Sequence, residues 1–138
     1  MRMRAHGFLI APFLLLVAGE AGARCLAYEP ANVTLTGEIE MRKLPGPPNY
    51  SSVARGDRPE NVYFVVLEKP VCVSADPTSR RNTRSHAGVE EVQLVISAVD
   101  ASAAVGKRMR LSGKLSGAQS GHHRTPVVIT VKEMTLAR

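Results

Sequence analysis

The chain has 138 residues, a formal net charge of +6, two cysteines and three tyrosines. It shows no internal repeat at a fixed period, and no linker long enough to separate a second domain. Because a chain of this length suits one domain, these features exclude a repeat protein and a multidomain protein. The mild basicity favours anionic partners of any kind and identifies none of them.

The first 23 residues have the pattern of a secretory signal peptide. Arg2 and Arg4 precede an apolar run over 8–17, and small residues close the segment at Ala23. A membrane-spanning helix needs roughly 20 apolar residues, so this run of about ten favours a cleaved signal over a retained transmembrane anchor. We expect cleavage after Ala23, a mature domain at 24–138 with a charge of about +5, and a periplasmic or secreted location.

The two cysteines are expected to pair. In an exported chain, a single disulfide between Cys25 and Cys72 is the simplest use of both. It would close a loop of about 48 residues, worth roughly 4 kcal/mol in the chain-entropy model. Arg24 stands where a lipid-modification signal requires a small residue, which favours a soluble protein over a lipoprotein. A redox or metal role is the weaker alternative, because there is no CxxC and two isolated cysteines lack zinc-site spacing.

The first half of the mature chain predicts two strands. Residues 32–42 alternate between apolar and polar, as in a half-buried strand. The inward positions are Val33, Leu35, Gly37, Ile39 and Met41. Residues 62–73 are rich in β-branched and aromatic side chains, with an interruption at Pro70. The polar segment 76–86, which carries Arg80, Arg81 and Arg84, predicts a mobile loop.

The second half predicts three more strands, over 89–97, 107–117 and 126–136. Their inward residues are Val92, Leu94 and Ile96, then Met109, Leu111, Gly113 and Leu115, then Val127, Ile129 and Val131. Between the first two of these strands, an Ala-rich stretch opened by Asp100 and ended by Gly106 predicts one or two helical turns.

These elements predict an all-β protein. Five strands with one apolar face each, a short helix between strands 3 and 4, and bulge-type glycines at Gly37 and Gly113 describe a small closed barrel. An OB-fold meets these requirements, so we expect a five-stranded OB-like barrel over 24–138. An open sandwich is the alternative, but it would leave unprotected strand edges.

Several runs resemble a known family. They are YEPANVTLTGEI, PGPPNYSSVARGDRPE, KPVCV, EVQLVI, GKRMRLSGKL and GHHRTPVVITV. Together they resemble the bacterial exported family labelled domain of unknown function 4431, in order from Cys25 to about Thr135. The resemblance implies an exported, single-disulfide, OB-like domain and little about activity. This chain departs from the family pattern at Arg124, where another His is expected, and in a longer Arg-rich insert around 76–86.

The Pro/Gly-rich loop over 44–60 is a candidate recognition element. Pro45, Pro47 and Pro48 stiffen its entry, and a stiff loop loses little entropy on binding. In an OB-fold, the connection after the first strand borders the ligand face. The candidate contact residues are Asn49, Tyr50, Asp57 and Arg58, with Tyr50 suited to stack on a sugar or a base. Alternatively, the loop only caps an open barrel end.

His122 and His123 are further candidates, in the hairpin between the last two strands. A metal site needs a third ligand, which nothing beyond His86 suggests, and adjacent residues of a strand point to opposite faces. Polar hairpin residues are the alternative interpretation. We expect no metal and no other cofactor.

Neither catalysis nor nucleic-acid binding finds support in the sequence. No serine lies in a nucleophile-elbow context, and no carboxylate pair is placed for acid and base roles, so we expect no enzymatic activity. Arg108, Arg110 and Lys114 form a basic stripe on one strand face. Single-strand binders pair such a stripe with several stacking aromatics, whereas the mature chain offers few, so we do not expect a nucleic-acid partner.

Three functions therefore stay open. The leading one is a non-catalytic, exported OB-like binding or accessory module that holds a protein or envelope-associated ligand. The second is an oligosaccharide- or nucleotide-binding OB domain, in which Tyr50 stacks on the ligand and Arg108 and Arg110 meet its charge. The third is a purely structural module.

Overall fold

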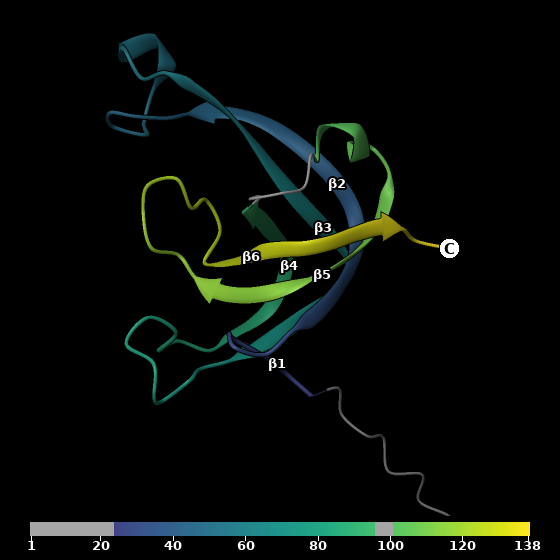
Figure 1. Ribbon diagram of the computed structural model, residues 1–138. Coiled ribbons are helices and arrows are strands. Elements are labelled where there is room, and N and C mark those ends of the chain that lie inside the picture. The colour runs from purple at the N-terminus through teal and green to yellow at the C-terminus, as the bar shows by residue number, and fades with distance from the viewer. Residues whose placement is uncertain (1–23, 96–100) are drawn as a thin grey trace, which may run out of the picture.

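The computed structural model describes residues 24–95 and 101–138 (Figure 1). The predicted signal peptide, Ile96 and Asp100 lie outside these residues. The described part contains β1 (Leu26–Ala27), β2 (Val33–Pro45), β3 (Pro59–Ser74), β4 (His86–Val95), β5 (Arg108–Gly117) and β6 (Val127–Leu136). In the described part of the predicted helical stretch, from Ala101 on, the structure has a 3-10 turn at Ser102–Ala104, and another 3-10 turn occupies Val53–Arg55. No helix within 24–95 and 101–138 is long and apolar enough to cross a membrane.

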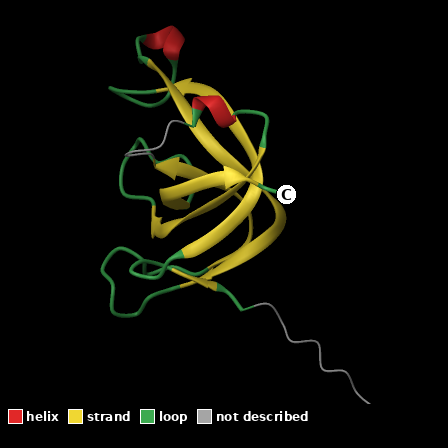
Figure 2. Cartoon of the chain, turned by 45° about the vertical axis from the view of Figure 1, so that its right-hand side comes forward, coloured by secondary structure: helices red, strands yellow, loops and turns green. Residues whose placement is uncertain are grey.

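Five of the strands close into a barrel (Figure 2). β2 pairs antiparallel with β3 and with β5, β5 pairs antiparallel with β6, and β6 runs parallel to β4. The pairing of β3 with β4 completes the circuit. The predicted all-β, five-stranded barrel is therefore confirmed. The unpredicted β1 adds two residues in parallel to the end of β3.

The two glycines predicted to mark bends lie where the barrel wall curls. Gly37 pairs with Leu67 of β3 and with Met109 of β5, so β2 is paired on both of its edges at this point. A Cβ at Gly37 would lie 2.0 Å from the carbonyl oxygen of Val66, which leaves room for glycine alone. The pairing of β5 with β6 shifts register between Ser112 and Gly113, which confirms the predicted bulge.

Of the predicted inward residues that the structure describes, which leaves out Ile96, all but one lie in the barrel interior. They include Val33, Leu35, Ile39, Val92, Leu94, Met109, Leu111, Leu115, Val127, Ile129 and Val131. Met41 was expected inside but is 42% exposed. The prediction is wrong because β2 leaves β5 after Glu38 and continues as a two-stranded ribbon with β3, which has no opposite wall.

The predicted disulfide is confirmed. Cys25 and Cys72 are bonded, with 4.6 Å between their Cα atoms. The bond fastens the N-terminal segment to β3 beside the short β1 pairing. Tyr28, just after β1, is 4% exposed and packs in the barrel core.

Candidate binding site at two joined loops

The loop between β2 and β3, residues 46–58, is called the proline loop here. It forms the tip of the β2–β3 ribbon, which extends beyond the barrel (Figure 1). The amide of Gly46 donates to the carbonyl of Arg58 at 2.6 Å, and the amide of Arg58 donates to Pro47 at 2.9 Å. These bonds close the base of the loop, in keeping with the stiffness that its prolines predict.

Asp57 organises the proline loop from within. Its carboxylate accepts hydrogen bonds from the amides of Asn49, Ser51 and Ser52 at 2.9, 2.7 and 2.8 Å, and the residue as a whole is 3% exposed. The Ser52 amide, followed by that of Ser51, lowers the pKa of Asp57 to about 2. The sequence predicts that Asp57 contacts a ligand, but in the structure its carboxylate oxygens accept hydrogen bonds from its own loop. Asn49 and Arg58 are exposed.

Tyr50 joins the proline loop to the loop between β5 and β6, residues 118–126, called the histidine loop here. Its hydroxyl lies 2.9 Å from Nε2 of His122, and the two rings meet edge to face with centroids 5.1 Å apart. The Arg124 guanidinium lies 5.2 Å from the Tyr50 ring centroid. A Cβ at Gly121 would lie 2.7 Å from the same ring, so glycine permits this close approach. The structure thus brings together two candidates from distant parts of the sequence.

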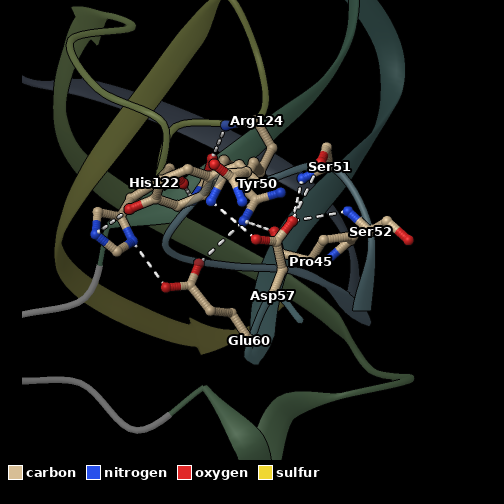
Figure 3. A network of polar contacts seen from close by, with 10 residues as sticks. Pro45, Tyr50, Ser51, Ser52, Asp57, Glu60, His122 and Arg124 are labelled. Atoms are coloured by element: carbon tan, nitrogen blue, oxygen red, sulfur yellow. Dashed lines mark hydrogen bonds and ion pairs between the residues drawn. The ribbon is translucent and has the colours of Figure 1, made fainter. Parts of the chain in front are cut away.

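Glu60, at the start of β3, completes the junction (Figure 3). One carboxylate oxygen lies 2.8 Å from Nδ1 of His122, and the other accepts from Nη2 of Arg124 at 3.0 Å. A proton on Nδ1 would donate to Glu60 and leave Nε2 to accept from the Tyr50 hydroxyl. Arg124 also donates to the carbonyl of Pro45 at 2.6 Å. These contacts tie the histidine loop to the base of the ribbon.

The sequence does not single out Glu60, and it notes Arg124 only as a departure from a family pattern. The Arg124 side chain is 13% exposed, and its Nε is buried without a hydrogen-bond partner among the described residues. Glu60 and Arg124 are 64 positions apart and follow no periodic pattern, so no local feature of the sequence indicates that they pair.

His122 and His123 have different roles in the histidine loop. Nδ1 of His123 accepts from the amide of Gln119 at 2.8 Å, so this ring stabilises the turn. Burial, followed by the proximity of His122, lowers the pKa of His123. In the described part of the chain, no three His, Cys, Asp or Glu side chains gather in a way that could hold a metal ion.

A groove of about 450 Å³ begins at the junction and follows β3 and β4. It is lined by Glu60, Asn61, Val62, Tyr63, Gln93, Leu94 and His122. Gln93 fixes the histidine loop to this wall, because its Nε2 donates to the carbonyl of His122 at 2.8 Å and its Oε1 accepts from the amide of Arg124. The groove and the joined loops therefore form one continuous, internally braced surface.

Arg108 and Arg110 lie elsewhere. They stand at the start of β5, whereas the histidine loop follows its end, and a ten-residue strand spans about 30 Å. In Figure 1 the end of β6, which pairs with the start of β5, lies on the side away from the histidine loop. Arg108 is paired with Glu68, and Nη1 of Arg108 donates to the carbonyl of Arg138 at 3.0 Å. A small ligand at Tyr50 would not reach these arginines.

Residues 91–135 match the family described as Domain of unknown function (DUF4431). The matched segment includes the end of β4, all of β5, the histidine loop and most of β6. The match agrees with the resemblance found in the sequence. No curated protein matches this chain.

Proposed function

We propose that this protein is an exported, non-catalytic binding module of the bacterial envelope. It holds a protein or another envelope-associated ligand in the groove along β3 and β4, with the joined loops as its rim. The observation that carries the proposal is the junction of Tyr50, Glu60, His122 and Arg124, which fixes two loops from distant parts of the chain at one end of the groove.

The groove supports binding because of its size and its rigidity. Its volume of about 450 Å³ lies within the roughly 300–1,000 Å³ typical of ligand sites. Its rim is held by hydrogen bonds inside the protein, so little conformational entropy would be lost when a ligand binds. The predicted signal peptide and the intramolecular disulfide support export to an oxidising compartment.

The contacts of Glu60 favour binding over catalysis. This carboxylate, which lines the groove, has one oxygen on His122 and the other on Arg124. A general base needs an oxygen available to the substrate, and an acid–base pair needs a second suitably placed group. Both oxygens of Glu60 are instead engaged in holding the loops together.

Oligosaccharide binding is a second candidate, favoured by the groove lining. Tyr63 provides an aromatic ring, and Asn61 provides an exposed side-chain amide within the same groove. A sugar would therefore contact Tyr63 rather than Tyr50, whose hydroxyl and ring are engaged by His122 and Arg124. A purely structural capping loop would also make these contacts of Tyr50. Separate variants are therefore needed for the groove and for the junction.

The test is a pull-down from envelope extract with the mature, oxidised protein and two matched variants. Asn61→Arg places a long side chain in the groove, whereas Thr34→Arg makes a similar change at an exposed position of β2. We expect a species retained by the wild type and by Thr34→Arg and lost from Asn61→Arg. A glycan array with the same three proteins tests the second candidate.

A third variant separates the junction from the groove. Tyr50→Phe removes only the hydroxyl that contacts His122 and keeps the ring. If the proline loop is only a cap, Tyr50→Phe lowers the melting temperature and all four proteins retain the same species and bind the same glycans. That result would refute the binding proposal.

A further inference from the structure

The segment 76–86, called the arginine loop here, has no part in the proposed function, and the structure holds it firmly. The sequence predicts a mobile loop, yet Asn82 at its centre is 2% exposed. The Asn82 side-chain oxygen accepts from the amide of Gly117 at 2.9 Å, and its carbonyl accepts from the amide of Asp76 at 2.8 Å. The loop is therefore anchored to the end of β5.

A second anchor lies two residues further along the loop. The hydroxyl of Tyr28 donates to the carbonyl of Arg84 at 2.9 Å, and Tyr28 is itself packed in the barrel core. The hydroxyl of Ser85 accepts from the amide of Ala75 at 2.8 Å, which links the two sides of the loop. Because the backbone is fixed at Asn82 and Arg84, the side chains of Arg81 and Arg84 project from a defined frame.

Arg81 and Arg84, which are both exposed, line an open cavity of about 260 Å³ between the arginine loop and the base of the histidine loop. Arg81, Thr83, Arg84 and His86 contribute to the wall with Tyr28, and no Asp or Glu lines it. Among the described residues, neither guanidinium and no atom of the His86 ring has a hydrogen-bond or ion-pair partner. This is a cationic cavity without an internal counter-charge.

The nearest acid in the chain segment is already engaged. Oδ1 of Asp76 accepts from the amide of Thr78 at 2.9 Å and from its hydroxyl at 2.7 Å. It therefore stabilises the turn that begins the arginine loop, and it does not line the cavity. The two exposed guanidinium groups therefore keep their charge available to a bound anion.

The chemistry of the wall fits a tetrahedral oxyanion. The planar fork of an arginine donates in pairs to phosphate or sulfate oxygens, and such charge-assisted bonds are stronger than neutral ones. Thr83 and His86 add a hydroxyl and an imidazole N–H. The volume of about 260 Å³ is below the roughly 300–1,000 Å³ of sites for drug-sized ligands, so the cavity suits a small anion or one terminal group.

We propose that Arg81 and Arg84, with Thr83 and His86, form a binding site for a phosphate monoester group. The site is separate from the groove along β3 and β4 and does not depend on the proposed function. The group belongs either to a soluble phosphorylated ligand or to a lipid headgroup, since both present the same terminal oxygens.

The first experiment is calorimetric titration of inorganic phosphate into the wild type and three double variants. Arg81→Gln with Arg84→Gln removes both forks, and Arg81→Lys with Arg84→Lys keeps the charge without the fork geometry. The control, Arg80→Gln with Lys132→Gln, removes the same charge at exposed positions outside the cavity. We expect at least about tenfold weaker binding for the glutamine pair, an intermediate loss for the lysine pair and less than about twofold for the control.

A titration followed by amide chemical shifts locates the bound anion. Phosphate should move the amide signals of 81–86 and 117–118 in the wild type and leave those of the proline loop in place. Equal weakening in the glutamine pair and the control would show that only the overall basicity acts, and would overturn the proposal. Absence of saturable heat at millimolar phosphate in the wild type would overturn it as well.

Vesicles distinguish the two sources of the phosphate group. Phosphatidylcholine vesicles are compared with vesicles that also contain phosphatidic acid, a monoester, or phosphatidylglycerol, a diester. Binding to the phosphatidic acid vesicles that is lost in the glutamine pair supports a lipid source. Phosphate binding without vesicle binding supports a soluble ligand.

Discussion

Removal of the Cys25–Cys72 disulfide should lower the free energy of unfolding by about 4 kcal/mol. The bond joins residues 47 positions apart, so it closes a loop of about 48 residues that contains β1, β2 and most of β3. The chain-entropy relation for such a loop gives roughly 14 cal/mol/K, which is about 4 kcal/mol at room temperature. The perturbation is Cys25→Ser with Cys72→Ser, which leaves no lone thiol.

The folded state should change little on this substitution. Tyr28 stays in the core, and the amide of Glu29 donates to the carbonyl of Leu115 at 2.9 Å, so the N-terminal segment keeps its own anchors. The loss therefore arises mainly in the unfolded chain. For a domain of about 115 residues, each kcal/mol corresponds to about 4 °C, which predicts a melting temperature lower by roughly 15 °C.

Urea unfolding followed by circular dichroism measures this difference. The oxidised wild type, the reduced wild type and the double variant are compared, and the last two should coincide. Their m-values should exceed that of the oxidised protein, because an uncrosslinked unfolded chain exposes more surface. A double variant within about 1 kcal/mol of the oxidised wild type would refute the loop-entropy reasoning.

Three further predictions test other parts of the structure. Gly37→Ala should lower the free energy of unfolding, measured with urea, by about 3 kcal/mol or more, because the added Cβ would meet the Val66 carbonyl. Gly56→Ala has open space around it but a φ of 106°, so it should lower this free energy by about 1–2 kcal/mol. Equal losses for the two variants would contradict this reasoning. Asn82→Ala should lower the stability measured by thermal denaturation by about 1–3 kcal/mol, because it leaves the buried Gly117 amide without its acceptor. The control Asn32→Ala, at an exposed position, should lower it by less than about 0.5 kcal/mol. Asp57 has a pKa of about 2 in the folded protein, below its value in the unfolded chain. Its contribution to the stability of the folded state is therefore present above about pH 4 and is lost as pH falls towards 2. The urea midpoint of the wild type should therefore fall more steeply over this range than that of Asp57→Asn, and parallel curves would contradict the assignment.

The alternation of apolar residues predicted most of the barrel interior, though not core residues such as Tyr28 and Ala104. In β5, for example, Met109, Leu111 and Leu115 point inward as the period of two requires. Gly113 was predictable as a bulge because a glycine on an apolar face has no side chain to pack there. Met41 shows the limit of such patterns, since alternation reports which residues share a face and not whether a second wall covers that face.

A second apolar layer was not predictable for a related reason. Phe64 and Val128 are buried but lie outside the barrel core, on the opposite strand faces from Val65 and Ile129. The Arg42 guanidinium lies 4.3 Å from the Phe64 ring centroid and covers it, while it also pairs with Glu91. Burial on this outer face depends on side chains that reach across from other strands, so the period along one strand does not reveal it.

The candidate site also depends on contacts between residues far apart in the sequence. These contacts decide what a substitution at each residue can test. The sequence selects Tyr50 because an aromatic residue in a stiff loop suits stacking on a ligand, but the structure uses its ring and hydroxyl to join two loops. The residues that line the groove, such as Asn61, are polar strand positions that resemble any solvated face in the sequence. A change at Tyr50 therefore perturbs the rim and its stability together. A change at Asn61 perturbs the groove while the junction of Glu60, His122 and Arg124 stays intact, so it is the more direct probe of binding.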